Sequence, residues 1–562
     1  MFEKTFTLKI AGLAGFGIKS GGQLISKILI DSGYFVTDYN EYPSLVRGGH
    51  NAYQITFSRE KVFAPHYNVD FFFSINPNHW QTHTDEFTKD SLIFVDEDLK
   101  EITEKKGNFL YLPLKELANE VGSLVVSNTI CVGVVSYLLN LDSNLSKKLI
   151  DKSYQKFSEI NLLAFDAGYK YAKDNFSKYK QNITSVKTKQ KNTGFYDGNE
   201  AFGWGLIKAG INFYAAYPMT PATGTLHFLA TKQEEFNIKV IHPEDEISAA
   251  NMTAGAAFAG ARAATGSSGG GFALMNEAIS YCGVAEIGMV YYLVSRPGPA
   301  TGLPTWTAQA DLLHAIYSGH GEFPKVVIAP GDLDESFGMG IESLNLAAEL
   351  QTPIIVVSDK FLGESSSNTK DLSKEKENIK SGEISKKPIQ NFKRYDLNTK
   401  TGVSPLTIPG TIGGEFLANS YEHNEVGFST EDPILASEMH QKRMQKLKTA
   451  LKLTPKPTFF GSDKAKKLII SWGSTKGVIL EALKSIKNKD EYAFLQIKTL
   501  WPINPDLKVI TNSFKEIIVI ENNGTSQLTT LLKSQFDFNP TQIITKDNGR
   551  PFFPEEIYAK LK

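Results

Sequence analysis

Three short segments in the middle of the chain combine stiff loops with side chains that can bind or activate a small acid. The first, Tyr217–Thr223, places Thr220 between Pro218 and Pro221. Because proline fixes its backbone φ angle and lacks an N–H donor, this loop is stiff and presents the Thr220 hydroxyl at a set position. The alternative is a plain turn whose threonine caps the following helix.

The second segment, His242–Ile247, carries three carboxylates, at Glu244, Asp245 and Glu246, and runs into a helix made mostly of small residues. Acids in a first turn have a structural explanation, because each stabilises the helix dipole by about 0.3–1 kcal/mol. A small-residue helix, however, packs closely, so we expect Glu246 to be buried. Burial raises the pKa of a carboxyl group unless a partner stabilises the charge, and Glu246 is therefore our main catalytic candidate.

In the third segment, Ser295–Trp306, Arg296 directly follows an apolar strand. A guanidinium at this place can bind a carboxylate with two parallel hydrogen bonds, and the alternative is a structural arginine at the strand edge. Each of the three segments follows a predicted strand. Because ligands bind at the carboxyl ends of parallel strands, we expect the three segments to meet there.

A glycine cluster near the N-terminus, Gly12–Gly22, follows a predicted strand and opens a helix, which suits a phosphate at the helix N-terminus. As a dinucleotide fingerprint it is imperfect, since Gly15 and Gly17 are followed by Ser20 instead of a third glycine, although Asp38 lies at the expected distance. The alternative is a tightly packed strand–helix turn.

A second N-terminal loop, Arg47-Gly48-Gly49, puts a cation beside two flexible residues. It either contacts a phosphate or forms a turn with a solvated arginine.

Strand-like and helix-like stretches alternate in three regions, which is typical of α/β folds. Polar linkers at Lys178–Asn192 and Ser366–Lys387 predict domains over residues 1–180, 195–370 and 385–562. The middle region predicts a doubly wound parallel sheet. Residues between Arg394 and Lys464, irregular and then charged and helical, are expected to wrap around the domains or form an interface. The elements that we expect include Phe6–Ile10, Ile18–Ser32, Ala52–Phe57, Phe71–Ile75, Leu92–Val95, Phe213–Ala216, Lys239–Ile241, Met289–Val294, Val326–Ile328, Pro353–Val357, Leu468–Trp472 and Ile517–Ile520.

Composition limits the class of protein. The chain has 562 residues, 41% hydrophobic and 22% charged, with a formal net charge of -1. A near-neutral charge gives no reason to expect nucleic acid, since phosphate binding requires a basic surface. No run of about 18 apolar residues predicts a membrane span, and no apolar signal region precedes the first strand, so we expect a cytoplasmic protein without a membrane partner.

Cysteine is scarce. Cys131 and Cys282 are the two cysteines of the chain, and they lie in different predicted domains, which argues against a disulfide framework. An iron–sulfur cluster normally takes four thiolates. Any such cluster must therefore come from another polypeptide.

The central segments together resemble one known family, the α subunits of 2-oxoacid:ferredoxin oxidoreductases. The N-terminal region, with Arg47-Gly48-Gly49, is similar to the γ component of these enzymes. The chain thus looks like a γ–α fusion of the 2-oxoglutarate synthase type, with a γ-type α/β domain, a thiamine pyrimidine-binding domain and a transketolase C-terminal-like α/β domain. The residues that carry the resemblance are Tyr217–Pro221, Pro243–Glu246, Arg296–Thr305, Thr307–Leu312 and, in the last region, Gly549–Phe552.

The resemblance implies coenzyme A-dependent oxidative decarboxylation of a 2-oxoacid, with electrons passing to ferredoxin. Glu246 matches the glutamate that hydrogen-bonds the aminopyrimidine of thiamine diphosphate and activates it. Thr220 and Arg296 match residues that position the substrate. The other residues that the resemblance implies are Tyr217, Pro218, Ser268 and Gly269 for thiamine diphosphate, and Arg47, Gly48 and Gly49 for coenzyme A.

The resemblance also implies a β subunit. Thiamine enzymes need a second half-site, where Mg²⁺ bridges the diphosphate to an Asp and an Asn within Gly-Asp-Gly and Asn-Asn. Gly331-Asp332-Leu333 departs from that pattern, and Asn522-Asn523 has no Gly-Asp-Gly upstream. We therefore expect no metal site in this chain, and expect Mg²⁺ and a [4Fe-4S] cluster in a β subunit that shares the thiamine diphosphate.

Departures from the family pattern bear on the substrate. Met219 replaces a commoner isoleucine, Ser267–Gly271 replaces Thr-Ser-Gly-Pro-Gly, and Trp306 stands where Lys or Arg is common. Loss of a cation at Trp306 weakens the case for a dicarboxylate and leaves pyruvate and branched-chain or aryl 2-oxoacids as alternatives. The γ–α fusion as a whole still favours 2-oxoglutarate.

Two other functional classes explain less. An NAD-dependent dehydrogenase would rest on Gly15, Gly17 and Asp38 and would explain nothing in the central segments. A non-catalytic binding protein would have no physical need for a buried carboxylate at Glu246.

Overall fold

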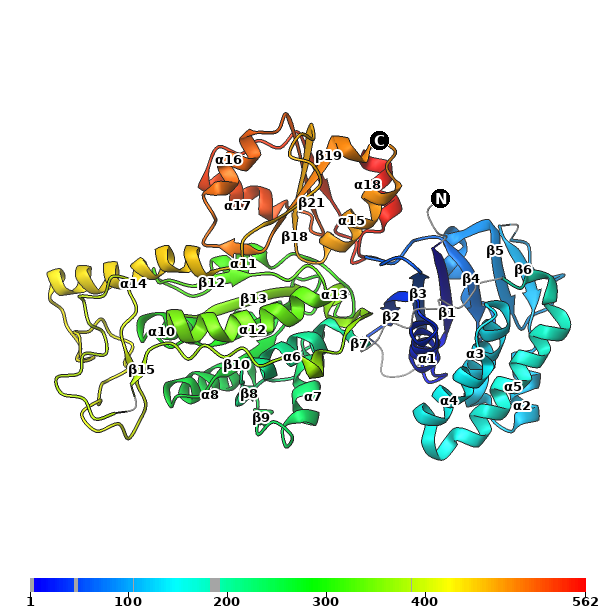
Figure 1. The fold of residues 1–562 in the computed structure, drawn as a ribbon, viewed down its shortest axis with the longest axis horizontal. Helices are drawn as coiled ribbons and strands as arrows, with labels where there is room; N and C mark the ends of the chain where they lie inside the picture. Colours follow the sequence, from blue (N-terminus) through cyan, green and yellow to red (C-terminus); the bar gives the residue numbers. More distant parts are fainter. Residues whose placement is uncertain (1–4, 45–48, 105, 182–192, 386, 562) are drawn as a thin grey trace.

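The computed structural model describes residues 5–44, 49–104, 106–181, 193–385 and 387–561. They form three α/β lobes, which Figure 1 draws in blue to cyan, in green, and in orange to red. The expected α/β class is confirmed. Expected elements agree closely with observed ones where the apolar pattern is strong: the strand expected at Phe6–Ile10 is β1 (Phe6–Leu13), and the helix expected at Ile18–Ser32 is α1 (Ile18–Asp31).

The N-terminal lobe is built on a mixed sheet in the order β6-β5-β4-β1-β3-β2-β14-β7. In β1, Leu8 and Ile10 face the main helix-covered core, while Ala11 packs in a separate cluster on the other face. The other elements of this lobe are β2 (Phe35–Glu41), β3 (His50–Ser58), β4 (Val69–Ser74), β5 (Phe87–Val95), β6 (Asn108–Tyr111), α2 (Leu114–Val121), α3 (Ser127–Leu138), α4 (Ser143–Tyr154) and α5 (Ser158–Asn175).

The last two strands of that sheet come from the central region. They are β7 (Thr193–Asp197) and β14 (Ser366–Lys370), and β14 joins β2 where Ser367 pairs with Thr37. The expectation of a polar linker over Ser366–Lys387 is therefore wrong for its first five residues. Strand pairing uses backbone hydrogen bonds, so a polar segment without an apolar pattern can still join a sheet edge.

The central lobe confirms the doubly wound sheet, in the order β20-β12-β13-β11-β10-β8-β9. Along β11, Tyr291 and Leu293 face one core, and Tyr292 and Val294 face another, so helices cover both faces. Its strands are β8 (Phe213–Ala215), β9 (Lys239–Ile241), β10 (Ala263–Ser267), β11 (Val290–Ser295), β12 (Val326–Ile328) and β13 (Ile354–Asp359). Its helices are α6 (Gly198–Lys208), α7 (Thr223–Lys232), α8 (Glu246–Phe258), α9 (Gly269–Leu274), α10 (Asn276–Val284), α11 (Leu312–Ile316), α12 (Leu333–Leu350) and α13 (Lys360–Glu364).

The C-terminal lobe has a five-stranded sheet in the order β17-β19-β18-β21-β22 and also lends β20 to the central sheet, antiparallel to β12. Its elements are β17 (Thr458–Phe460), β18 (Lys467–Trp472), α15 (Thr475–Ser485), β19 (Tyr492–Ile497), β20 (Thr499–Trp501), α16 (Asp506–Asn512), β21 (Glu516–Glu521), α17 (Gln527–Gln535), β22 (Gln542–Thr545) and α18 (Pro554–Leu561).

A wrapping segment, residues 378–432, runs along the central lobe (yellow in Figure 1) and continues into α14 (Pro433–Leu453). It contains a two-stranded parallel pair, β15 (Ile384–Ser385) and β16 (Leu406–Thr407). Helix α14 packs on α12. The expected wrapping role of the irregular and charged region is confirmed.

Candidate active site

The central segments meet at the carboxyl edge of the central sheet. Thr220 follows β8, Ser268 follows β10 and Arg296 follows β11, and these three strands are neighbours in the sheet. Glu246 begins α8, which is reached from β9 on the far side of β8. The topology therefore brings together the residues expected there from the sequence.

Glu246 is buried at this edge, with 4% of its surface exposed. It is the first residue of α8, whose N-terminus is capped by Asp245 accepting a hydrogen bond from Ser248 N at 2.7 Å. Its Oε1 atom has no hydrogen-bond partner among the described residues. A buried acceptor without a partner is costly, so this oxygen fits a donor brought by a ligand.

The space beside Glu246 depends on a glycine. A Cβ atom added at Gly271 would lie 2.4 Å from Glu246 Oε1 and 2.2 Å from Ser267 Oγ, which is too close for any side chain. The preceding Ser268 is fully buried, and its Oγ also lacks a partner in the described part of the chain. The backbone thus approaches the carboxylate closely, and polar atoms around it are left for a bound molecule.

Arg296, which follows β11, is hydrogen-bonded to the loop that follows β8. Its Nη1 donates to the carbonyl oxygen of Thr220 at 2.6 Å. Burial lowers the pKa of Arg296, and the nearby carboxylate of Asp311 opposes that shift. One part of the guanidinium is thus structural, while the rest can receive a substrate carboxylate. Thr220 itself is half-buried and is positioned through its carbonyl rather than through its hydroxyl.

Asp311 is a residue of this edge that the sequence did not single out as a candidate. Its Oδ2 is buried without a partner among described residues, and a Cβ on Gly269 would lie 2.7 Å from it. Burial raises the pKa of Asp311. Asp311 lies in the segment Thr307–Leu312, which carries part of the family resemblance.

Tyr217 and Pro218 stand at the start of the same loop. The Tyr217 side chain is 38% exposed, and its ring lies edge-on to His242 with the centroids 5.8 Å apart. Pro218 is half-buried. These two residues therefore lie at the solvent-exposed border of the candidate site, and Glu246 lies in its buried part.

A pocket of about 820 Å³ lies where all three lobes meet. Pro43 and His50 line it from the N-terminal lobe, Trp306 from the central lobe, and Lys546 and Arg550 from the C-terminal lobe. Arg550 covers Trp306, with its guanidinium carbon 3.1 Å from the ring centre. Arg550 of the C-terminal lobe therefore places a positive charge next to residue 306, where the family pattern has Lys or Arg and this chain has Trp.

The glycine loop expected near coenzyme A is only partly described. Gly49 precedes β3 and has a φ angle of +84°, a conformation that suits glycine. Arg47 and Gly48 lie outside the described residues.

Asp38 does not have the free carboxylate that a dinucleotide site needs. It is 1% exposed, accepts a hydrogen bond from the Tyr53 hydroxyl, and accepts another from Ser366 N at 2.6 Å. It thereby ties β2 to the start of β14. Asp38 is therefore not available to bind the ribose of NAD, which removes the acidic residue on which the NAD-dependent dehydrogenase alternative rested.

Asp38 also makes stability depend on pH. Burial raises its pKa from 3.8 to about 6, so between these values the folded state binds more protons than the unfolded state. The contribution of Asp38 to stability therefore falls as the pH rises through this window, by up to about 3 kcal/mol. We expect the melting temperature of the wild type, relative to Asp38→Asn, to fall between about pH 4 and about pH 6.5. A difference that does not change with pH would contradict this assignment.

The nearest candidates for a magnesium half-site hold structural contacts. Asp332 caps α12 and pairs with Lys476 at 2.5 Å. Asn522 Nδ2 donates to the carbonyl oxygens of Lys546 at 3.0 Å and Arg550 at 3.1 Å, and Asn523 Nδ2 donates to Gln309 O at 3.2 Å. Across the described ranges, no group of three or more His, Cys, Asp or Glu side chains is arranged to hold a metal ion. Asp332 and Asn523 thus connect the central and C-terminal lobes, and the Asn522 side chain bonds within the C-terminal lobe.

Within the described part of the chain, no helix has the length and apolar character needed to cross a bilayer.

Comparisons with known proteins cover nearly the whole chain. A family model described as "Pyruvate flavodoxin/ferredoxin oxidoreductase, thiamine diP-bdg" matches residues 204–443, and one described as "Pyruvate ferredoxin/flavodoxin oxidoreductase" matches residues 7–171. The 2-oxoacid:ferredoxin oxidoreductase subunit alpha of Sulfolobus sp is 30% identical over 98% of this chain and 96% of its own. The 2-oxoglutarate oxidoreductase subunit KorA of Mycobacterium tuberculosis is 26% identical over 98% of this chain and 90% of its own.

A solved structure agrees with these matches. The 2-oxoglutarate:ferredoxin oxidoreductase from Magnetococcus marinus, solved with 2-oxoglutarate, coenzyme A and succinyl-CoA bound, superposes with a TM-score of 0.91 at 30% identity, covering 99% of both chains. Because similarity in sequence and structure extends over almost the full length, the chain belongs to the family of 2-oxoacid:ferredoxin oxidoreductase α subunits.

Proposed function

We propose that this chain, together with a β subunit, catalyses the coenzyme A-dependent oxidative decarboxylation of a 2-oxoacid to acyl-CoA and CO₂ in the cytoplasm, with electrons passing to ferredoxin. The observation that carries the proposal is the buried, unpartnered Oε1 of Glu246 beside Gly271. We also propose that the chain divides into domains at residues 1–180, 195–370 and 385–562.

The residues of the carboxyl edge fit thiamine diphosphate. Glu246 would accept a hydrogen bond from its aminopyrimidine ring through Oε1, and Ser268 and Gly269 would lie along it, with Tyr217, Pro218 and Thr220 at the rim. When bound, this cofactor supplies the carbon nucleophile and the electron sink that decarboxylation needs. Glu246 sits in a nearly dry site, where a single hydrogen bond to a carboxylate is strong.

Arg296 is proposed to orient the substrate. With Nη1 held by the Thr220 carbonyl at 2.6 Å, the guanidinium plane is fixed before a substrate arrives. Its remaining donors can pair with the 2-oxoacid carboxylate. This pairing would fix the position of the keto carbon relative to the cofactor bound beside Glu246.

A β subunit is proposed to hold the Mg²⁺ and the [4Fe-4S] cluster. Both cysteines of this chain are buried, and burial raises the pKa of each thiol, that of Cys282 to about 12. Protonated, inaccessible thiols do not ligate iron. The names of the relatives as α subunits support a partner of this kind.

Coenzyme A is proposed to enter through the 820 Å³ pocket between the three lobes. Lys546, which pairs with Glu556 at 2.7 Å, is the proposed cation for a phosphate group, and the Trp306 ring offers an apolar surface. Pro43 and His50, which line this pocket, flank in the sequence the expected loop of Arg47, Gly48 and Gly49, of which Arg47 and Gly48 lie outside the described residues. The Magnetococcus marinus enzyme, solved with coenzyme A bound, supports the same co-substrate.

The substrate is proposed to be 2-oxoglutarate, with pyruvate and branched-chain or aryl 2-oxoacids as alternatives. Arg550 above Trp306 supplies a cation that the sequence at residue 306 lacks. Gly549 and Thr307 connect the two segments, since Thr307 N donates to Gly549 O at 3.1 Å. A cation held so close to the segment that begins with Arg296 suits the second carboxylate of a dicarboxylic substrate.

Arg550→Met is expected to raise KM for 2-oxoglutarate by roughly 10- to 150-fold, because it removes a hydrogen bond to a charged group worth about 1.5–3 kcal/mol. The KM for pyruvate, which lacks the second carboxylate, is expected to stay nearly unchanged. Steady-state viologen reduction with both substrates measures the difference. Arg550→Lys keeps the charge and is the matched control. Its KM for 2-oxoglutarate is expected to lie between those of the wild type and Arg550→Met. An equal rise for both substrates would remove Arg550 from substrate selection.

The direct test is to purify the chain with its partners from its own cells and assay 2-oxoacid- and coenzyme A-dependent viologen reduction over a panel of 2-oxoacids. A co-purifying, iron-containing partner with activity is expected. A solitary protein that neither binds thiamine diphosphate nor reduces viologen would contradict the proposal.

A further inference from the structure

A second cavity, of about 230 Å³, lies at the amino edge of the central sheet, opposite the candidate active site. Asn212, Gly288 and Gln351 line it, and they stand just before β8, β11 and β13 respectively. The active-site residues follow these or neighbouring strands at the other end, about 15–20 Å away for strands of five or six residues. The wrapping segment closes the cavity from outside with Ile384 and Phe416.

Two arginines line this cavity with unused donors. Arg394 is 1% exposed, and its Nη2 donates to the carbonyl oxygen of Glu286 at 2.7 Å. Its Nε and Nη1, like the Nε of Arg262, have no hydrogen-bond partner among the described residues. Guanidinium N–H groups remain charged donors, so leaving them buried without an acceptor is costly.

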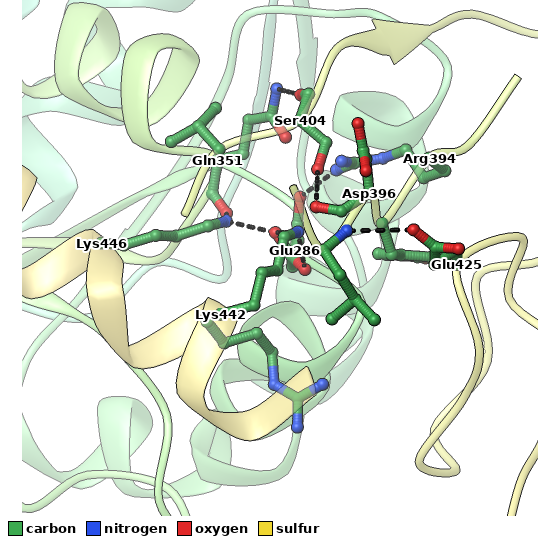
Figure 2. A network of polar contacts seen from close by, with 12 residues as sticks. Glu286, Gln351, Arg394, Asp396, Ser404, Glu425, Lys442 and Lys446 are labelled. Atoms are coloured by element: carbon green, nitrogen blue, oxygen red, sulfur yellow. Dashed lines mark hydrogen bonds and ion pairs between the residues drawn. The ribbon is translucent and has the colours of Figure 1, made fainter. Parts of the chain in front are cut away.

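The surroundings of Arg394 carry surplus positive charge (Figure 2). Glu286, which is fully buried, pairs with Lys442 at 2.7 Å and with Lys446 at 2.7 Å. Two buried lysines thus share the Glu286 carboxylate, and Arg394 lies beside them with a bond only to the main-chain carbonyl of Glu286. Burial lowers the pKa of Lys446 to about 7, as expected where positive charges outnumber their partners.

The other two acids drawn in Figure 2 do not compensate this charge. Glu425 pairs with Lys393 at 2.6 Å and accepts a hydrogen bond from Leu397 N at 3.1 Å. The carboxylate of Asp396 accepts from Asn398 N at 3.0 Å. Both face the wrapping segment's own loops, so Nε and Nη1 of Arg394 and Nε of Arg262 are left for a ligand. The other two donors of Arg262 bind Lys380 O at 2.8 Å and Asn345 Oδ1 at 2.7 Å.

We propose that this cavity binds a small organic carboxylate. The free donors, Nε and Nη1 of Arg394 and Nε of Arg262, provide the polar contacts, and charge-assisted hydrogen bonds are the strongest kind available. Most of the other lining residues are apolar, although Asn212, Glu286 and Ser381 also reach the cavity, so the ligand's body is mainly hydrocarbon rather than a second anionic group. The apolar residues that line the cavity are Ala257, Phe258, Ala261, Ile287, Leu344, Ile384, Leu406 and Phe416. A fully hydrated inorganic phosphate fits these walls poorly, because most of its oxygens would lose water without gaining donors.

The site can be tested with butyrate as the probe and the full chain in complex with its partner. Saturable binding is expected by calorimetric titration, with butyramide, which has the same size and no charge, binding at least roughly tenfold more weakly. Ala348→Leu fills the cavity from α12 without touching any charge and is expected to abolish binding at unchanged melting temperature. Arg394→Met is expected to weaken binding by roughly tenfold or more.

A control separates this cavity from the active site, since Arg296 is also proposed to bind a carboxylate. Butyrate binding at the amino edge is expected to survive Arg296→Ala and to disappear in Ala348→Leu. Absence of saturable binding, or binding that Ala348→Leu leaves intact, overturns the proposal. Displacement of butyrate by an equal concentration of inorganic phosphate would overturn the choice of an organic carboxylate.

Discussion

Glu246→Gln is expected to lower kcat for coenzyme A-dependent viologen reduction by about 10²–10⁴-fold, the usual cost of losing a positioned acid–base group. The glutamine has the same shape, so the space beside Gly271 is preserved. Oε1 has no partner to lose in the described part of the chain, so the melting temperature is expected to stay close to that of the wild type. What changes is the ability to accept a strong, charge-assisted hydrogen bond from the cofactor ring.

Glu244→Gln is the matched control for that experiment. Glu244 lies two residues upstream, is exposed to solvent, and undergoes the same loss of charge on substitution. Its activity is expected to remain within about twofold of the wild type, since exposed surface changes are usually worth less than about 0.5 kcal/mol. If Glu246→Gln keeps a large share of the activity, or if both variants lose activity equally, the catalytic assignment of Glu246 is wrong.

Arg296→Ala is expected to raise KM for the 2-oxoacid by roughly 10- to 150-fold, which corresponds to about 1.5–3 kcal/mol for a hydrogen-bonded charge. The guanidinium is fixed by the Thr220 carbonyl at 2.6 Å, so the wild type has little ordering cost when the substrate arrives. The concentration of thiamine diphosphate needed for half-maximal activity is expected to change little. Initial-rate measurements over both concentrations separate the two effects.

Arg296→Lys keeps the charge but lacks the planar fork, so an intermediate KM is expected. An unchanged KM in Arg296→Ala would mean that the arginine only supports the loop after β8. A parallel loss of thiamine diphosphate affinity would lead to the same conclusion, because the Thr220 loop also forms the rim of the cofactor side.

The elements with strong apolar periodicity could be predicted closely from the sequence. The strand expected at Val326–Ile328 is observed with those bounds, and the helix expected from Glu246 begins there. Short apolar runs identify buried strands because both faces of a parallel sheet are covered. Since parallel strands end at one edge, the placement of Thr220, Glu246 and Arg296 followed from the order of elements alone.

Elements without such a pattern could not be predicted. Ser366–Lys370 has no apolar side chain, yet it forms β14 and pairs with β2, more than three hundred residues earlier in the chain. Helix α14 was expected only as a charged helix, yet Lys442 and Lys446 point inward to the fully buried Glu286. A charged helical face normally faces water, and only a buried partner from another segment reverses that preference.

The sequence by itself determined the α/β class, and it predicted the chemistry of the carboxyl edge and the need for a partner, because these depend on local residue types and on the count of cysteines. Tertiary structure alone decided which far-apart segments meet: Arg550 over Trp306, Asp38 against Ser366, and Arg394 in the cavity at the amino edge. The physical reason is that burial and partner choice are set by packing between segments, which no local pattern of residues encodes.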